Sequence, residues 1–313
     1  MQNFLISFNV VFPIFLMMVL GFFLKKINIM SESTVKQVNN VIFRVFLPIM
    51  IFKNVYESDI DSVFDPKLIL FAAISVIALV AVLFLVIPLI EKDNKKRGVL
   101  IQGLFRSNFV IFGLPVTEAL CGSGVSGSAS VLVAIIIPIF NFIAVITLES
   151  FGDKKGSIGK ILKGIVTNPL IIASVLGLLI SFIGLKLPSV VEKSVSSVAG
   201  ITTPLALIML GASINFKTVK GNLRQILIGV IGRLVVVPAI FLALAVFVFK
   251  FRGNDLAILL TLFASPAAVS SFTMAQQMGG DDELAGHLVM FGTTACILTV
   301  FLWIFLIVQM GWV

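Results

Sequence analysis

The chain of 313 residues is 59% hydrophobic and only 12% charged, with a mean hydropathy of +1.15. Soluble domains carry about 25% charged residues, so this composition excludes a water-soluble globular domain. The net charge of +8 is therefore examined loop by loop for the orientation of the chain in the membrane, and it does not indicate nucleic-acid binding. Two cysteines and one histidine exclude a disulfide framework and a Cys/His metal cluster.

Ten apolar stretches are long enough to cross a bilayer as helices, which takes roughly 20 residues each. They lie at residues 4–24, 37–55, 67–90, 98–120, 129–149, 162–185, 195–214, 223–249, 255–278 and 286–312. The first stretch has no basic segment before it and no small-residue cleavage site after it. We therefore expect a retained transmembrane helix and not a signal peptide.

Basic residues are distributed unevenly over the linkers between these stretches. Linkers after odd-numbered spans hold 14 Lys and Arg residues, whereas linkers after even-numbered spans hold six. Because cytoplasmic loops carry the excess of Lys and Arg, we expect a plasma-membrane protein with both termini outside the cytoplasm. Asp281, Asp282 and Glu283 fall on the cytoplasmic side, but acidic residues contribute little to this rule.

The two halves of the chain share landmarks that are 156 residues apart. These pairs are Pro13 and Pro169, Gly21 and Gly177, and Pro48 and Pro204. Each half holds five spans, so the second copy would enter the membrane with the opposite orientation. We predict an all-α integral membrane fold of ten helices in a 5+5 inverted repeat, with residues 1–150 and 162–313 as the two copies. Inverted repeats are typical of secondary transporters.

Spans four and nine carry polar, small and proline residues where a lipid-facing helix would favour Leu or Ile. These residues are Ser107, Asn108, Gly113 and Pro115 in span four and Ser265, Pro266, Ala267, Ser270 and Ser271 in span nine. Proline removes a backbone donor and disturbs the preceding turn, so we predict that both spans unwind there and cross at mid-membrane. The N-terminal end of a half-helix binds carboxylates. A simple proline kink with a packing glycine is the alternative.

Three arginines lie inside predicted spans, namely Arg44 in span two, Arg106 in span four and Arg233 in span eight. Each costs at least about 2.5 kcal/mol at a helix centre, and no carboxylate lies at a comparable depth. An anionic cargo would offset this cost by charge-assisted pairing; snorkelling or pairing with backbone carbonyls is the alternative. We interpret Arg106 as a substrate residue because it adjoins the predicted break, and we leave both explanations open for Arg44 and Arg233.

Several polar residues have weaker claims to the site. Asn141 follows Pro138 in span five and either faces the crossing or bonds a neighbouring helix. Thr202 and Thr203 either form a wall of the pocket or pack helices together. Gln276 and Gln277 end span nine, where a gating role is one interpretation. His287 is expected at a solvated interface near the acidic residues at 281–283.

The order of these motifs resembles the auxin efflux carrier family over essentially the whole chain. The resemblance rests on the ten spans, on Ser107-Asn108 before Gly113-Leu114-Pro115, and on Ser265–Ala268 before Ala275–Asp281. That family contains bacterial and fungal permeases and the plant auxin exporters. The resemblance implies a fold similar to the bile-acid sodium symporters, with helices 1, 2, 6 and 7 as scaffold and helices 3–5 and 8–10 as transport domain. The chain differs from plant members in its short linker after span five and in Ser107, where they carry proline.

The sequence predicts a secondary transporter for a small organic anion, a mono- or dicarboxylate, that works by alternating access. A membrane-embedded sensor of the same ligand and an exporter of auxin-like aromatic carboxylates are the alternatives. Zinc-ligand pairs, nucleophile elbows and phosphate-binding loops are absent from the sequence, so we expect neither an enzyme nor ATP-driven transport. We expect no cofactor and no nucleic acid as partner, with coupling to Na+ or H+ left open. A homodimer in the lipid bilayer is compatible with the resemblance.

Overall fold

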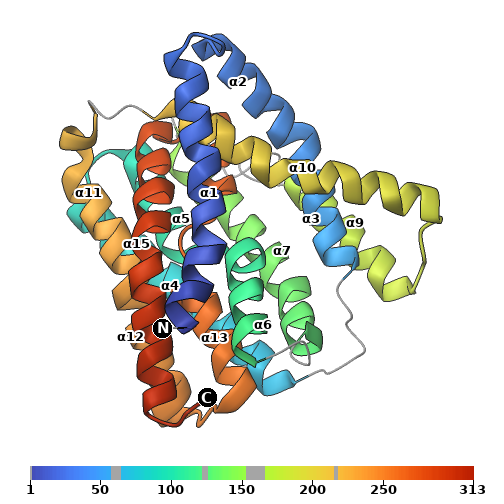
Figure 1. Cartoon of the computed structure of the whole chain (residues 1–313), viewed down its shortest axis with the longest axis vertical. Helices are drawn as coiled ribbons and strands as arrows, with labels where there is room; N and C mark the ends of the chain where they lie inside the picture. The colour runs from blue at the N-terminus through green and yellow to red at the C-terminus, as the bar shows by residue number, and fades with distance from the viewer. Residues whose placement is uncertain (1, 58–64, 122–125, 153–165, 215–217) are drawn as a thin grey trace.

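The computed structural model describes residues 2–57, 65–121, 126–152, 166–214 and 218–313 (Figure 1). Within these ranges the protein is a bundle of helices without strands, and one isolated antiparallel bridge joins Ser107 to Ala267. The linker at residues 153–165 lies outside the described residues, as do Lys154, Lys155, Lys160 and Lys163, which we counted among the cytoplasmic basic residues. The bridge marks the one place where two helices open to pair their backbones in the described part of the chain.

The first half contains seven α-helical segments and two π-helical turns. They are α1 (Gln2–Lys26), α2 (Glu32–Val41), η1 (Ile42–Phe46), α3 (Leu47–Tyr56), α4 (Pro66–Ile90), α5 (Asn94–Phe105), η2 (Phe109–Gly113), α6 (Leu114–Cys121) and α7 (Ser126–Phe151). Short polar side chains start several of these helices. Ser31 accepts from the Thr34 N–H at the start of α2, and Asp93 accepts from the Lys95 N–H at the start of α5. Such caps satisfy N–H groups that have no intrahelical partner.

The second half also consists of long and short helical segments. It contains α9 (Pro169–Ile183), α10 (Ser189–Ser213), α11 (Val219–Ile231), η4 (Gly232–Val236), α12 (Val237–Ala243), η5 (Leu244–Val248), α13 (Gly253–Ala264), α14 (Ser270–Gln277) and α15 (Asp282–Gln309). Residues 162–165 of the predicted span at 162–185 lie outside the described residues, and α9 begins at Pro169 with Asn168 as its cap. The side chain of Asp281 caps α15 by accepting from the Leu284 N–H.

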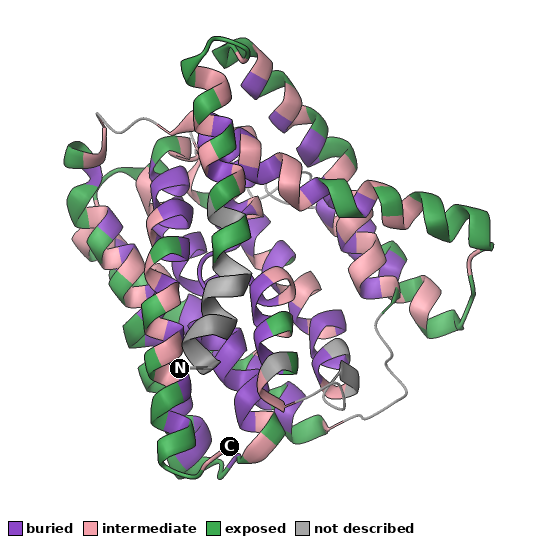
Figure 2. Cartoon of the chain, in the orientation of Figure 1, coloured by how far each residue is buried: buried purple, intermediate pink, exposed green. Residues whose placement is uncertain are grey.

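Among the described residues, six helical stretches are long and apolar enough to cross a membrane. They are Glu32–Tyr56, Pro66–Ile90, Val131–Phe151, Ser189–Ser213, Val219–Val248 and Asp282–Gln309, and shorter apolar helices cover Phe109–Glu118, Pro169–Ile183 and Gly253–Ala264. The outer faces of the bundle carry many exposed residues (Figure 2), and large apolar side chains such as Leu85 and Leu89 are 73% and 84% exposed. An exterior of this kind is stable in lipid, and the protein is a multi-pass membrane protein.

Glycines bring two pairs of helices into backbone contact. A Cβ atom on Gly21 of α1 would lie 1.9 Å from the carbonyl oxygen of Ile208 in α10, and one on Gly211 would lie 1.9 Å from that of Met18. Between α9 and α3, a Cβ atom on Gly177 would lie 3.1 Å from the carbonyl oxygen of Phe52. Small residues permit such close approach in membrane proteins, so α1 packs on α10 and α9 packs on α3.

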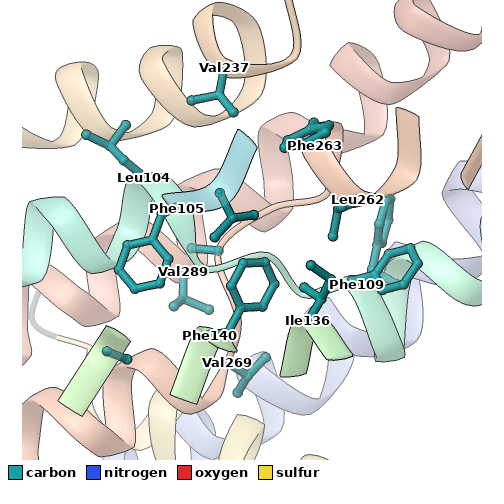
Figure 3. Close-up of a cluster of buried hydrophobic side chains, with 14 of the residues drawn as sticks. Leu104, Phe105, Phe109, Ile136, Phe140, Val237, Leu262, Phe263, Val269 and Val289 are labelled. Carbon is teal, nitrogen blue, oxygen red and sulfur yellow. The ribbon is translucent and has the colours of Figure 1, made fainter. Parts of the chain in front are cut away.

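Aromatic side chains enclose the middle of the bundle. Phe105, Phe109, Phe140 and Phe263 are buried there together with branched aliphatic residues (Figure 3). The Phe105 and Phe140 ring centroids are 6.0 Å apart. This packing surrounds the bridge between Ser107 and Ala267 with apolar material and gives the polar groups near it a low-dielectric environment.

Candidate functional site

Two interrupted helices meet at the centre of the bundle. Helix α5 ends at Phe105 and the chain becomes helical again at Phe109, while α13 ends at Ala264 and α14 begins at Ser270. The Asn108 N–H donates to the Pro266 carbonyl at 2.9 Å, and the Ala268 N–H donates to the Arg106 carbonyl at 3.1 Å. We call residues 106–108 and 265–269 the crossing. Spans four and nine are therefore unwound, as predicted, and the alternative of a simple proline kink is wrong.

A pocket with a cavity volume of about 50 Å³ lies against the crossing, and we call it the crossing pocket. Its walls come from the crossing and from α3, α7 and α10. The lining residues are Arg106, Ser107, Asn108, Val110, Ile111, Ala268, Val269 and Ser270, with Leu47, Met50, Ile51 and Asn54 of α3, Ile137, Phe140 and Asn141 of α7, and Thr202, Thr203 and Ala206 of α10. The pocket is apolar over most of its wall, with polar side chains at the crossing and on α3, α7 and α10.

The pocket gathers some of the predicted site residues and leaves others outside. Seven of them line it, namely Arg106, Ser107, Asn108, Asn141, Thr202, Thr203 and Ser270. Six others lie outside its wall, namely Gly113, Pro115, Ser265, Pro266, Ala267 and Ser271. Pro115 is exposed on α6, and the carbonyl of Ser265 is bonded to Arg233. The unwound residues thus divide between those that face the pocket and those that hold the crossing together.

Arg106 is 5% exposed and is held at the pocket wall by side chains. One Nη atom donates to Asn141 Oδ1 at 2.6 Å, and the other contacts the sulfur of Met274. Asn141 in turn donates from Nδ2 to Ser174 Oγ of α9 at 3.4 Å. Both interpretations of Asn141 therefore hold, because it lines the pocket and also bonds a neighbouring helix.

Two buried polar atoms of the crossing have no protein partner. Ser107 Oγ and Asn108 Nδ2 find no hydrogen-bond partner within the described part of the chain, although both residues are at least 96% buried. An unsatisfied buried group of this kind costs about 1–3 kcal/mol. Both atoms can donate a hydrogen bond, so the two side chains can bind an acceptor that enters the pocket.

Two helices begin at the pocket. The helix from Phe109 through α6 contributes Val110 and Ile111 to the wall, and α14 contributes its first residue, Ser270. Helix N-termini carry partial positive charge and N–H groups without intrahelical partners. None of the lining residues that the structure describes is acidic. Together with Arg106, these helix starts make the pocket suitable for an anion.

The opposite wall of the pocket is formed by α3 and α10. Thr202 Oγ1 donates to the Phe46 carbonyl at 3.1 Å, and Thr203 Oγ1 contacts the Met50 sulfur at 3.6 Å. The two threonines thus line the pocket and also join α10 to η1 and α3. Asn54 is a lining residue that the sequence analysis missed, because a single polar residue beside Lys53 has the appearance of a helix end.

A second and wider pocket, which we call the vestibule, has a cavity volume of about 620 Å³. It is lined by Lys36, Gln37, Asn40, Arg44, Gln276, Gln277, Gly280 and Asp282. Asn39 Nδ2 donates to Gln276 Oε1 at 2.7 Å, and Gln276 Nε2 donates to Asp282 Oδ2 at 2.8 Å. Arg44 is exposed in the vestibule and lies outside the crossing pocket, and Gln276 joins α2, α14 and α15.

Arg233 lies outside both pockets and is 2% exposed. Its guanidinium group donates to the carbonyls of Ser265 at 2.8 Å, Leu104 at 3.0 Å and Leu262 at 3.0 Å. Pairing with backbone carbonyls, one of the two explanations left open, therefore applies to Arg233. The prediction for His287 is wrong, because this residue is 1% exposed. Helix α15 begins at Asp282, so His287 lies more than one turn inside it.

Comparison with known proteins matches the chain to membrane transport proteins. The sequence profile of a family described as membrane transport protein matches residues 6–304. The chain is 26% identical over 316 residues to an uncharacterized transporter of Methanocaldococcus jannaschii, with 99% of each chain covered. It is also 23% identical over 305 residues to an uncharacterized transporter of Methanothermobacter thermautotrophicus, covering 95% of this chain and 97% of the relative. Neither these names nor the family description indicates an enzyme or states a cargo.

Proposed function

The chain belongs to the family of membrane transport proteins, and from this premise we propose that it is a secondary transporter of a small organic anion. The family match agrees with the resemblance to the auxin efflux carriers, which rested on the motifs at the crossing. Transport by this protein needs a cargo site within the membrane and a way to expose that site to each side in turn. The crossing pocket and the packing of the helices around it support both requirements.

The observation that carries the proposal is the pair of unsatisfied buried atoms, Ser107 Oγ and Asn108 Nδ2, beside Arg106. A carboxylate accepts hydrogen bonds from a hydroxyl, an amide and a guanidinium at once. Arg106 is the one charged side chain among the described lining residues, which favours a monocarboxylate over a dicarboxylate. The apolar wall that includes Ile51 and Phe140 favours a cargo with an apolar body. An aromatic carboxylate fits this description and stays the second candidate.

We further propose ten membrane crossings in a 5+5 inverted repeat, with residues 1–150 and 162–313 as the two copies. Matched backbone contacts support this arrangement. Gly21 approaches the carbonyl of Ile208, and Gly177 approaches the carbonyl of Phe52. Both members of the first contact are 156 residues from their counterparts in the second, which is the offset of the repeat. Reciprocal contacts are expected where two equivalent units face each other across a two-fold axis.

In this proposal α1, α2, α3, α9 and α10 form the scaffold, and the remaining helices form the transport domain. The crossing pocket lies between the two, because α3 and α10 supply one wall and the crossing supplies the other. The bond from Asn39 to Gln276 joins the scaffold to the transport domain and would act as a gate at the vestibule. Alternating access then consists of moving the crossing past the scaffold.

The distribution of Lys and Arg supports insertion in the plasma membrane with both termini outside the cytoplasm. We propose that the protein uses no organic cofactor and that an ion gradient, of Na+ or H+, drives any uphill transport. Lipid and the organic anion are then its partners, and a homodimer is compatible with this arrangement.

The test begins with purified protein and a thermal-shift screen of acetate, butyrate, benzoate and succinate. The monocarboxylate that raises Tm most is then used, radiolabelled, in counterflow assays with proteoliposomes. We expect Asn108→Ala to abolish counterflow and the ligand-induced rise in Tm while the protein stays folded. Asn222→Ala is the matched control, because Asn222 is equally buried and bonds Lys96 away from the crossing. Unchanged counterflow in Asn108→Ala would refute this site, and a Tm rise without any counterflow in the wild type would indicate a sensor.

A further inference from the structure

Backbone carbonyls surround the guanidinium group of Arg233. Its Nε and both Nη atoms donate to carbonyl oxygens of Ser265, Leu104 and Leu262 at 2.8–3.0 Å, and one Nη atom also approaches the Phe105 carbonyl at 3.4 Å. The residue is 2% exposed. The acceptors of Arg233 are thus backbone carbonyls and not carboxylates.

These carbonyls belong to the C-terminal ends of two helices. Leu104 and Phe105 end α5, and Leu262 lies in the last turn of α13, which Ser265 follows. The last carbonyls of a helix have no intrahelical donor, and each helix end carries a partial charge of about −0.5. Two such ends amount to about one negative charge, which the single charge of Arg233 matches. Without a cation, the two ends would repel each other inside the membrane.

The local backbone is built so that Arg233 reaches this position. The residue lies in the π-helical turn η4, and its neighbour Gly232 packs against α5. A Cβ atom on Gly232 would lie 2.5 Å from Leu104 Cδ2. The glycine therefore allows η4 to approach α5 closely, and π-helical turns of this kind are frequent at functional sites.

We propose that Arg233 is a resident counter-cation of the crossing. The carbonyls at the two helix ends form a monovalent-cation site, and the Arg233 guanidinium fills it permanently. The crossing therefore keeps its shape without a bound metal ion at this place, and the helix starts at the crossing pocket remain free to attract the anion. Arg233 is a positioning residue, because it acts on the cargo only through the crossing.

Removing the side chain should leave a site that free guanidinium can fill. We expect Arg233→Ala, purified in detergent, to lose about 5 °C or more in Tm, and millimolar guanidinium chloride to restore part of that loss. The wild type should show no such rise. Arg97→Ala is the matched control. Arg97 also donates to carbonyls at a helix end, those of Glu91 and Pro88, but at a solvated edge where water replaces it.

Two results would overturn the proposal. The first is a Tm for Arg233→Ala equal to that of the wild type, and the second is a guanidinium effect no larger than in Arg97→Ala. If Arg233→Ala does not fold, the pair Arg233→Lys and Arg233→Gln decides. The charged variant should retain the higher Tm, and equal values would refute a need for the cation. No organic anion is present, so the outcome is independent of the cargo.

Discussion

The crossing has a pocket side and a packed side, and each contains a buried arginine. On the pocket side Arg106 bonds the side chain of Asn141, and its neighbours Ser107 and Asn108 keep polar atoms without protein partners. On the packed side Arg233 bonds only backbone carbonyls, and the hydroxyls of Thr117 and Thr261 bond each other at 2.6 Å. The helices that begin at the crossing have their N-terminal ends at the pocket. The helices that end there, α5 and α13, have carbonyls that accept hydrogen bonds from Arg233. A buried arginine is therefore not by itself evidence of a ligand site, and its acceptors decide its role.

The largest effect is expected from Arg106→Gln on the pocket side. Loss of a charge-assisted bond to the carboxylate should weaken anion binding by about tenfold to a hundredfold, with little change in Tm without ligand. Titration of the ligand-induced Tm rise measures this change. Arg106→Lys should retain part of the affinity, because it keeps the charge without the planar geometry. An Arg106→Gln variant that binds the anion normally would remove the distinction between the two sides.

Thr117→Val should instead affect the packed side. The substitution removes the bond between α6 and α13, while the Thr261 hydroxyl keeps the carbonyls of Ala257 and Ile258 as acceptors. The expected cost is therefore about 1 kcal/mol of unfolding free energy. The double variant with Thr261→Val should lose little more stability than Thr117→Val, since the bond between the two hydroxyls is already absent. Chemical denaturation in detergent measures the three variants. Anion affinity should stay unchanged, and a loss of affinity without a loss of stability would contradict the assignment to the packed side.

A smaller effect is expected from Arg44→Ala in the vestibule. Arg44 is exposed there, so its charge attracts an approaching anion without contacting it at the crossing. The initial rate of uptake from the vestibule side should fall about twofold to threefold at low ionic strength and recover at high ionic strength, where the charge is screened. A salt-independent loss of affinity would instead make Arg44 part of the cargo site.

The smallest effect concerns Glu91 at the end of α4, remote from both sides of the crossing. Burial acts to raise the pKa of Glu91, but hydrogen bonds from Asp93, Gln225 and Lys92 outweigh it and lower the pKa below its ordinary value of 4.5. The lowered pKa stabilises the fold above pH 4.5, and this stabilisation is lost as the pH falls through the folded-state pKa. Glu91→Gln should therefore lose less Tm than the wild type on acidification from about pH 5 to about pH 3. Equal losses would show that the network around Glu91 does not contribute to acid stability.

The sequence identified the interrupted spans because serine, asparagine and proline are unfavourable in the middle of a lipid-facing helix. The family resemblance rests on the same residues. The role of Arg233 was beyond sequence analysis, because its carbonyl acceptors lie 29 to 129 residues away and every residue type has a carbonyl. Asn54 was missed for a related reason, since its place in the wall depends on how α3 packs against the crossing. The residues that interrupt a helix could be predicted from the sequence, whereas contacts between side chains and distant backbone carbonyls could not.

The backbone contact between α1 and α10 determines which movements are available to the protein. Gly21 and Gly211 leave no room for a single methyl group, so these two helices cannot rotate or slide against each other without separating. We expect them to travel as one rigid rod through every stage of the cycle. Larger displacements are then left to interfaces between side chains, which can exchange one set of apolar contacts for another. Cross-linking α1 to α10 should consequently leave the protein active, whereas cross-linking the crossing to α3 should arrest it.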